Sequence, residues 1–297
     1  MKTTFIPRTL PIRVACAFLF ITAITLPPRS RNDITAPMPE PTIALSSDSD
    51  RVTETSEDAP IIYRTYTINN VGGAKPLAQI KSEAGEENLA AVLKLNRVDD
   101  AHLRNGETIL IPEQVTDLID LSPFPREAEQ AREIPRLLVV SRRVQAFGAY
   151  EFGRLVRWGP TSTGKKHTPT PAGLYHANWR SKATRSTVNR AWLLRWYVNI
   201  DNEKGIAVHE YELPGYPASH SCVRMQADDA AWFYYWAKEG KLSADGKSDE
   251  TGTPVLVFGE YSYGEKPPWK QLMTDSRATT VTKVELEEAL LPYAGKF

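Results

Sequence analysis

Two histidines and one cysteine lie close together in the sequence and have side chains suited to nucleophilic catalysis. His209, His220 and Cys222 fall within 14 residues, and His209 ends the apolar run 206–208. A thiol with an ordinary pKa of about 8.5 is mostly protonated at neutral pH, so a nucleophilic cysteine needs an imidazole or another positive group nearby. Residues 213–217 are typical of a loop that returns the chain towards His209. We therefore expect Cys222 and His209 to form a nucleophile–base pair.

The cysteine count leaves two other interpretations of Cys222 open. The only other cysteine, Cys16, lies in an N-terminal apolar segment, so an exported chain would have no disulfide partner for Cys222. A lone thiol can be a small buried hydrophobe instead of a nucleophile. It could also join His209 and His220 in a zinc site, although no fourth ligand with suitable spacing is evident. We predict no metal and no other cofactor.

Composition narrows the class of protein. The chain has 297 residues, with 36 basic and 36 acidic side chains, so its formal net charge is zero. This length allows a buried core and two domains. The absence of an extended run of lysine and arginine argues against nucleic acid as a partner.

The first 60 residues read as a leader and a linker. Residues 1–26 begin with basic side chains and continue into an apolar run that ends before Pro27, which is the length of a signal-peptide core and short for a membrane span. We expect export to the periplasm or cell envelope. An uncleaved leader that anchors the chain in the inner membrane stays open as an alternative, and it is the only membrane contact predicted. Residues 27–60 are rich in proline, serine and acidic residues and predict a disordered linker.

Residues 61–113 predict a small α+β domain with the order strand, helix, helix, strand. This segment resembles a LysM domain. The match covers residues 63–113 and rests on the motifs Tyr66-Thr-Ile68, Leu77 with Ile80, Leu95-Asn96, Leu103-Arg-Asn-Gly106 and Ile109-Leu-Ile-Pro112. The residues 73–77 replace the usual Gly-Asp-Thr of the family. The resemblance implies binding of N-acetylglucosamine-containing glycans such as peptidoglycan, while a packing module without a ligand stays open.

Residues 114–135 predict a connector, and the chain becomes rich in strands from residue 136. Strands are expected at 137–140, 143–147, 155–158, 192–200, 206–208 and 255–258. One helix is expected at 228–239, stopped by Gly240, with Trp232, Tyr235 and Trp236 as its core stripe. The pattern indicates a mainly β domain, a sandwich or barrel-like fold with a short helix. Residues 260–297 form a C-terminal tail with no assigned task.

The three remaining histidines have simpler interpretations. We expect His102 to lie on the surface of the LysM-like segment. His176 is expected to be packed in a strand, and His167 to lie in a solvated loop.

The run His209-Glu with Ser219-His-Ser-Cys-Val-Arg224 resembles the signature of the YkuD-type L,D-transpeptidases. Two flanking segments, Gly252-Thr-Pro-Val255 and Ser162-Thr-Gly164 with Thr168-Pro-Thr-Pro-Ala-Gly173, agree with the same family. The resemblance covers residues 136–259 and implies a YkuD-like β-sandwich. Ser221 stands where the family has glycine, which can change the shape of the site because glycine tolerates positive φ. Glu210 follows His209 where the family more often has a small residue.

The resemblance also implies roles for individual residues. Cys222 would be the acylated nucleophile, and His209 the base, oriented by a backbone carbonyl. His220 would shape the site, and backbone N–H groups around it, Ser221 and Cys222 would hold the oxyanion. Ser219 would support the loop. The implied substrate-binding residues are Arg224, Ser162, Gly164, Thr170 and Pro171.

The function implied by the resemblance is that of a peptidoglycan L,D-transpeptidase in cell-wall biogenesis and cell shape. The cysteine would form a thioester with a tetrapeptide stem, release D-alanine and pass the acyl group to an amine acceptor. Two alternatives stay open. One is an L,D-carboxypeptidase that hydrolyses the same thioester, and the other is an inactive wall-binding scaffold, which the serine at position 221 motivates.

Overall fold

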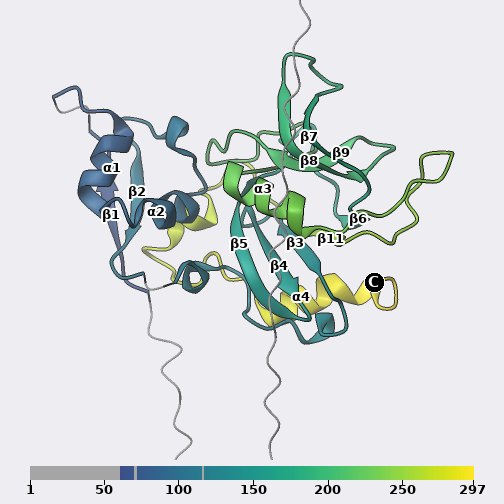
Figure 1. Cartoon of the computed structure of the whole chain (residues 1–297). Coiled ribbons are helices and arrows are strands. Elements are labelled where there is room, and N and C mark those ends of the chain that lie inside the picture. The colour runs from purple at the N-terminus through teal and green to yellow at the C-terminus, as the bar shows by residue number, and fades with distance from the viewer. Residues whose placement is uncertain (1–60, 70–71, 116) are drawn as a thin grey trace, which may run out of the picture. The chain divides into compact units, whose positions relative to one another are not determined.

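The computed structural model describes residues 61–69, 72–115 and 117–297 (Figure 1). The leader and linker predicted for residues 1–60 lie outside these described residues. Across the described ranges, no helix has both the length and the apolar character needed to cross a membrane.

The N-terminal module folds around its own small core. Strand β1 (Tyr63–Thr67) pairs antiparallel with β2 (Thr108–Pro112), and helices α1 (Pro76–Ala84) and α2 (Leu89–Asn96) lie between them in sequence. The side chains of Ile80, Val92 and Ile109 are buried in one apolar cluster. The order of the elements agrees with the expectation from the sequence, while the assignment to the LysM family stays a prediction.

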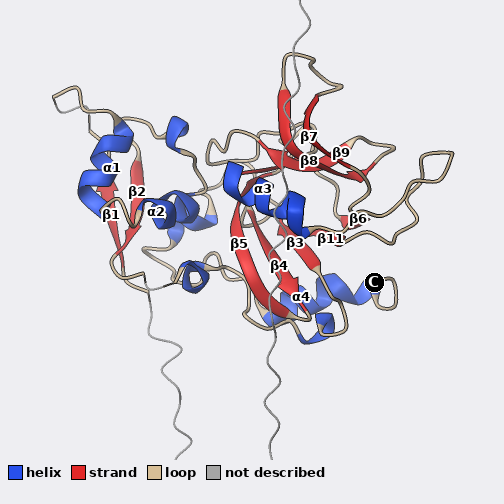
Figure 2. Ribbon diagram, viewed as in Figure 1, coloured by secondary structure: helices blue, strands red, loops and turns tan. Residues whose placement is uncertain are grey.

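The rest of the chain is built on one sheet of nine strands (Figure 2). Their order across the sheet is β6-β11-β3-β4-β5-β10-β9-β8-β7, and β3 with β11 and β9 with β10 are the parallel pairs. The strands are β3 (Leu137–Ser141), β4 (Ala146–Glu151), β5 (Arg154–Ser162), β6 (Gly173–His176), β7 (Arg180–Arg185), β8 (Leu193–Asp201), β9 (Ile206–Glu210), β10 (Val223–Met225) and β11 (Pro254–Phe258).

Both faces of this sheet are covered. In β3, Leu137 and Val139 belong to one apolar cluster, whereas Leu138 and Val140 belong to another. Successive side chains of a strand point to opposite faces, so a strand buried on both sides reads as a continuous apolar run. The mainly β domain expected from the sequence is confirmed, and it is one curled sheet instead of two separate layers.

The helix and one strand differ in detail from the predictions. Helix α3 spans Ala227–Trp236 and ends before Gly240, because the amide of Lys238 donates to Thr253 Oγ1 at 2.8 Å and the chain turns there. Tyr235 is 62% exposed, whereas Phe233 and Trp236 are buried. The buried side of the helix therefore includes Phe233 and not the predicted Tyr235. The strand predicted at 143–147 begins at Ala146, after Gln145 turns the chain with a positive φ.

The C-terminal tail packs on the two preceding parts of the chain. Helix α4 (Lys283–Leu290) adds Leu286 and Leu290 to a core cluster of the sheet. Lys270 Nζ lies 2.7 Å from Glu107 Oε1 of the N-terminal module.

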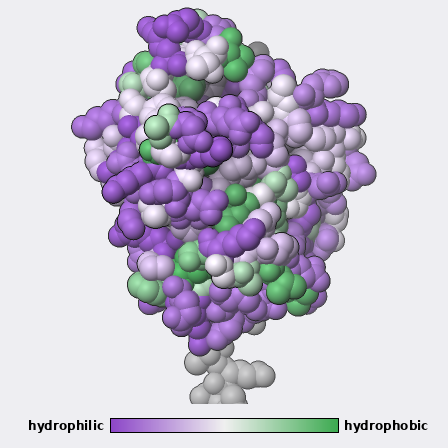
Figure 3. All heavy atoms as spheres, turned by 90° about the vertical axis from the view of Figure 1, so that its right-hand side faces the viewer, coloured by the Kyte–Doolittle hydropathy of each residue, from purple (hydrophilic) through white to green (hydrophobic). Residues whose placement is uncertain are grey.

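Five short 3-10 turns complete the described elements, at Asp100–His102, Leu118–Leu121, Glu129–Ala131, Pro268–Gln271 and Leu291–Tyr293. The face in Figure 3 is mostly hydrophilic with small separate hydrophobic patches, in line with the burial of apolar strand residues.

Candidate active site

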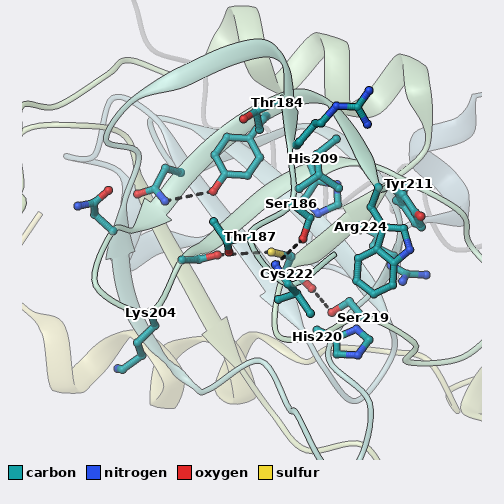
Figure 4. A pocket seen from close by; sticks show the side chains of 18 of the residues that line it. Thr184, Ser186, Thr187, Lys204, His209, Tyr211, Ser219, His220, Cys222 and Arg224 are labelled. Atoms are coloured by element: carbon teal, nitrogen blue, oxygen red, sulfur yellow. Dashed lines mark hydrogen bonds between the residues drawn. The ribbon is translucent and has the colours of Figure 1, made fainter. Parts of the chain in front are cut away.

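Two adjacent parallel strands bring the predicted residues together. His209 lies in β9 and pairs in register with Arg224 of β10, and Cys222 directly precedes β10. The connecting loop, residues 211–222, brings the chain back to the side of β9, where β10 begins. We call it the thiol loop because it carries Cys222. His209, Cys222 and Arg224 therefore come to line the same pocket, as Figure 4 shows.

The pocket has a volume of about 240 Å³. The hairpin of β7 and β8 supplies most of its remaining wall, with aromatic side chains at several points. Its lining residues are Trp179, Thr184–Val188, Trp192, Leu194, Tyr197, Asn199, Asn202, Lys204, Gly205, His209, Tyr211, Ser219, His220, Cys222 and Arg224.

His209 is held rigidly as a neutral imidazole. Its side chain is nearly fully buried, and its ring stacks on Tyr197 with the centroids 6.2 Å apart and meets Tyr211 edge-on at 6.0 Å. Nδ1 donates to the backbone oxygen of Glu210 at 2.8 Å, so Nε2 carries the lone pair. Burial, with a smaller effect of the Arg224 charge, lowers the pKa of His209 to about 4. The ring can therefore accept a proton throughout the neutral range.

Cys222 is a half-buried free thiol. Its Sγ lies 3.7 Å from the backbone oxygen of Gly205. Burial raises the pKa of the Cys222 thiol, while a hydrogen bond from the backbone of Ala207 and the Arg224 charge act in the opposite direction. The resting thiol is therefore protonated at neutral pH, and a reaction at sulfur needs a base to remove the proton.

The loop that carries the thiol has an unusual backbone. Ser219 Oγ donates to the Cys222 backbone oxygen at 2.5 Å, and Ser221 has φ +84°. In the described part of the chain, no group accepts a hydrogen bond from the amide N–H groups of His220, Ser221 or Cys222. Successive free amides next to a left-handed residue form the type of concave donor site that holds an anion.

Ser221 adopts a conformation that costs a non-glycine residue about 1–2 kcal/mol. We expect Ser221→Gly to stabilise the protein by about 0.5–1 kcal/mol, because relief of this strain exceeds the entropy that glycine adds to the unfolded chain. Urea unfolding monitored by tryptophan fluorescence measures the change. Ser82→Gly is the control, since Ser82 lies in helix α1 with an ordinary backbone and glycine there should destabilise. Equal losses in both variants would contradict the strain at Ser221.

Residues 162–170, which precede β9 in sequence and include three of the predicted substrate-binding residues, make hydrogen bonds that support the thiol loop. Ser162 Oγ donates to Tyr216 O at 2.8 Å, and Thr170 Oγ1 accepts from the Gly164 amide at 2.9 Å and donates to Cys222 O at 3.5 Å. A Cβ on Gly164 would lie 2.1 Å from the Thr168 backbone oxygen, so the close approach requires glycine. Neither these three residues nor Pro171 line the pocket described above. Their contact with a substrate stays a prediction.

His220 also lines the pocket. Its ring lies 5.1 Å from that of Trp192, and Nε2 is 2.9 Å from Lys165 Nζ. Since the ammonium group can only donate, Nε2 accepts and Nδ1 carries the proton. Nδ1 is buried without a partner among the described residues. Burial and then the charges of Lys165 and Arg224 lower the pKa of His220.

Arg224 is anchored within the loop while it lines the pocket. Its guanidinium carbon lies 4.5 Å from the centroid of the Tyr211 ring, and Nη1 donates to the Glu212 backbone oxygen at 3.3 Å. Both interactions fix the part of the loop that follows β9. These interactions are compatible with the substrate contact that the resemblance implies for Arg224, which stays a prediction.

Sequence reasoning missed the wall formed by the β7–β8 hairpin. Strand β7 has no alternating apolar pattern, and Thr184–Val188 carry no recognisable motif. Trp192 and Tyr197 were visible as strand aromatics, but nothing in the sequence places them beside His220 and His209.

Within the ranges that the structure describes, no group of three or more histidine, cysteine or acidic side chains is arranged to hold a metal ion. His176 is buried in β6 and His167 is exposed, as expected.

Comparison with known families identifies the part of the chain that holds this site. Residues 135–257 match the family model of YkuD, the L,D-transpeptidase catalytic domain. We call this segment, 135–257, the YkuD domain after the model that it matches. The segment that it covers includes His209, Cys222 and every strand from β3 to β10. A search of curated proteins finds no match.

Solved structures with similarity to the YkuD domain include three L,D-transpeptidases. One from Stackebrandtia nassauensis is 20% identical, with 43% of this chain and 57% of that chain covered and a TM-score of 0.35. One from Mycobacterium smegmatis is 22% identical, with 42% and 59% covered and a TM-score of 0.34. L,D-transpeptidase 1 of Mycobacterium tuberculosis is 24% identical, with 42% and 62% covered and a TM-score of 0.31. This chain therefore spans less than two thirds of the length of these structures.

Proposed function

We propose that this chain is an exported peptidoglycan L,D-transpeptidase that uses Cys222 as its nucleophile. The observation that carries the proposal is that a protonated thiol and a buried imidazole, whose Nδ1 is bound to a carbonyl, line one pocket of the YkuD domain. A neutral histidine held by a carbonyl at Nδ1 has its Nε2 lone pair available, and general-base activation follows when this atom comes within hydrogen-bond reach of the thiol.

The first half-reaction follows from these groups. Sγ of Cys222 adds to the carbonyl carbon that joins the third stem residue to the terminal D-alanine, while His209 Nε2 takes the thiol proton. The tetrahedral intermediate then expels the D-alanine nitrogen, which receives that proton from His209. The products are a thioester on Cys222 and free D-alanine.

The second half-reaction transfers the acyl group and restores the thiol. An amine of a second stem attacks the thioester carbonyl, His209 accepts the amine proton, and the departing sulfur takes a proton back. The product is a new amide cross-link. The free amides of the thiol loop can stabilise both oxyanions, and one such donor is often worth about 3 kcal/mol in the transition state.

The charge of the pocket suits a substrate with several carboxylates. Arg185, Lys204 and Arg224 line it, and none of its described lining residues is acidic. Stem peptides carry free carboxylates on their side chains and at the terminus, and arginine and lysine stabilise such groups through charge-assisted hydrogen bonds. Aromatic walls from Trp179 and Trp192 add apolar contact for the peptide.

The N-terminal module and the leader extend the proposal. A LysM-like module at 61–113 would hold the enzyme on peptidoglycan glycan, and a leader at 1–26 would deliver it to the periplasm or keep it at the inner membrane. Both proposals rest on the sequence motifs described above.

A hydrolytic reaction is the second candidate. The pocket is open to solvent at Cys222, which is half-buried, so water has access to a thioester formed there. Hydrolysis of the thioester would make the protein an L,D-carboxypeptidase. An inactive wall-binding scaffold is the third candidate, and the strained Ser221 motivates it.

Product analysis distinguishes these candidates. The full chain is incubated with purified disaccharide-tetrapeptide, and the products are separated by chromatography and identified by mass. Transpeptidation predicts D-alanine release with a cross-linked dimer, whereas hydrolysis predicts D-alanine with tripeptide alone. Neither product should form with Cys222→Ala. An unchanged tetrapeptide with the natural protein, in a preparation that binds peptidoglycan, would contradict the enzyme and favour the scaffold.

A further inference from the structure

The N-terminal module makes direct backbone contact with the loop that joins His209 to Cys222. The amide of Asp99 donates to the Leu213 backbone oxygen at 3.0 Å, and the amide of Leu213 donates back to Asp99 Oδ2 at 2.7 Å. Next to them, Val98 and Pro214 form an antiparallel bridge. These contacts join two segments more than 100 residues apart in sequence and clamp the loop on one side.

Asp99 is itself held in place from within the module. Its Oδ1 accepts from the His102 amide at 3.0 Å and lies 2.6 Å from His102 Nδ1. One carboxylate oxygen is thus fixed by the module and the other by the loop. His102 therefore has a structural task and is not the plain surface residue expected from the sequence. The carboxylate of Asp99 needs no rearrangement to hold Leu213.

The clamped part of the loop adjoins the pocket. Leu213 is fully buried, and the residue before it, Glu212, offers its backbone oxygen to Arg224 Nη1 at 3.3 Å. Tyr211 packs both on the Arg224 guanidinium and on the His209 ring. A shift of Leu213 would therefore displace groups that touch the candidate base and the cation beside it.

Buried polar contacts fix the N-terminal module to the YkuD domain. Lys94 of α2 forms a buried ion pair with Asp229 of the YkuD domain at 2.6 Å. Arg97 is buried and donates from Nε to the Val144 backbone oxygen at 3.0 Å. Packed elements of this kind transmit displacement because they cannot deform continuously.

We propose that Asp99 is a positioning residue for the acyl transfer assigned to Cys222, so that the N-terminal module sets the geometry of the thiol loop in addition to any ligand that it binds. The inference rests on the proposed function, because acylation of Cys222 is its readout. Misplacement of a catalytic group by about 1 Å can cost on the order of 100-fold in rate. Loss of the Asp99 clamp should accordingly lower the rate of the chemical step more than the affinity for the acyl donor.

The test uses the full chain and the carbapenem imipenem as the acyl donor. Acylation is followed by intact mass at several imipenem concentrations, which separates the maximal rate from the half-saturating concentration. We expect Asp99→Ala to lower the maximal rate at least about 10-fold and to change the half-saturating concentration less than about threefold. Asp99→Asn keeps one acceptor oxygen for the Leu213 amide but turns its NH2 group towards the His102 amide, so its maximal rate should lie between those of the natural protein and Asp99→Ala.

Glu107→Ala is the matched control. It removes the module's ion pair with Lys270 and touches neither Leu213 nor the thiol loop, so its maximal rate should be unchanged. The thermal midpoints of all variants are measured in parallel. A similar fall in rate for Glu107→Ala and Asp99→Ala would show a general loss of structure and overturn the proposal.

Two other outcomes separate this inference from the proposed function. If the natural protein is acylated and Asp99→Ala reacts at the same maximal rate, Asp99 does not position the loop, although the proposed function stands. Absence of any acylation in the natural protein would instead overturn the proposed function.

Discussion

Replacement of His209 with glutamine should lower the maximal rate of Cys222 acylation by about 10²- to 10⁴-fold, the range that a positioned general base contributes. Glutamine can still occupy the space between the Tyr197 and Tyr211 rings, but it cannot take the thiol proton. The raised pKa of Cys222 makes this loss large, because little thiolate forms without a base. Acylation by imipenem, followed by intact mass, measures the rate.

The pH dependence makes the same prediction more specific. Burial lowers the pKa of His209 to about 4, and only the neutral ring accepts a proton. The rate in the natural protein should therefore stay nearly constant from about pH 5 to pH 7 and fall as the pH drops through 4. In His209→Gln the reaction depends on thiolate alone, so its rate should rise about tenfold per pH unit.

His176→Gln provides the control for this variant. His176 is likewise a buried strand histidine whose pKa is lowered mainly by burial, but it lies in β6 and does not line the pocket. Its acylation rate should equal that of the natural protein. A rate for His209→Gln within about threefold of this control would contradict the role of His209 as base.

The second large effect concerns stability. Lys94→Met should lower the free energy of unfolding by about 3–5 kcal/mol, the usual cost of removing one partner from a buried ion pair. Lys94 is almost fully buried and Asp229 is completely so, with Nζ 2.6 Å from Oδ2. Burial raises the pKa of Asp229, while Lys94 and Arg157 act in the opposite direction, so loss of Lys94 leaves the buried carboxylate with the partly exposed Arg157 as its remaining cationic partner.

Urea unfolding measures this change. Lys81→Met is the control, since the Lys81–Glu86 pair in the same module is exposed and should contribute about 0–1 kcal/mol. The double variant Lys94→Met with Asp229→Asn should recover part of the loss, because it removes the buried charge that Lys94 no longer compensates. Equal costs for Lys94→Met and Lys81→Met would show that the ion pair does not hold the module on the YkuD domain.

The local parts of the site could be predicted from the sequence. The run from His209 to Arg224 places the candidate base, the loop and the thiol within one strand–loop–strand unit, and such short-range order is visible in residue types and spacing. The positive φ of Ser221 follows from the same reasoning, since the serine stands at a position typical of glycine. Strands such as β3 were also evident, because residues 137–140 form a continuous apolar run.

Long-range packing could not be predicted. Strand β7 has a polar sequence and β10 has three residues, so neither shows a periodic pattern, although both build the pocket. Buried charges such as Lys94 and Arg97 look like surface residues until the partner is known. The clamp at Asp99 and the packing of the tail likewise depend on contacts between segments far apart in the chain.

The most direct test of the central claim is intact-protein mass spectrometry of the full chain with imipenem or a tetrapeptide donor, alongside Cys222→Ala. The account predicts one acyl adduct on the natural protein, located to Cys222 by peptide mapping, and none on the variant. Absence of an adduct on the natural protein, or the same adduct on Cys222→Ala, would contradict a thioester at this residue.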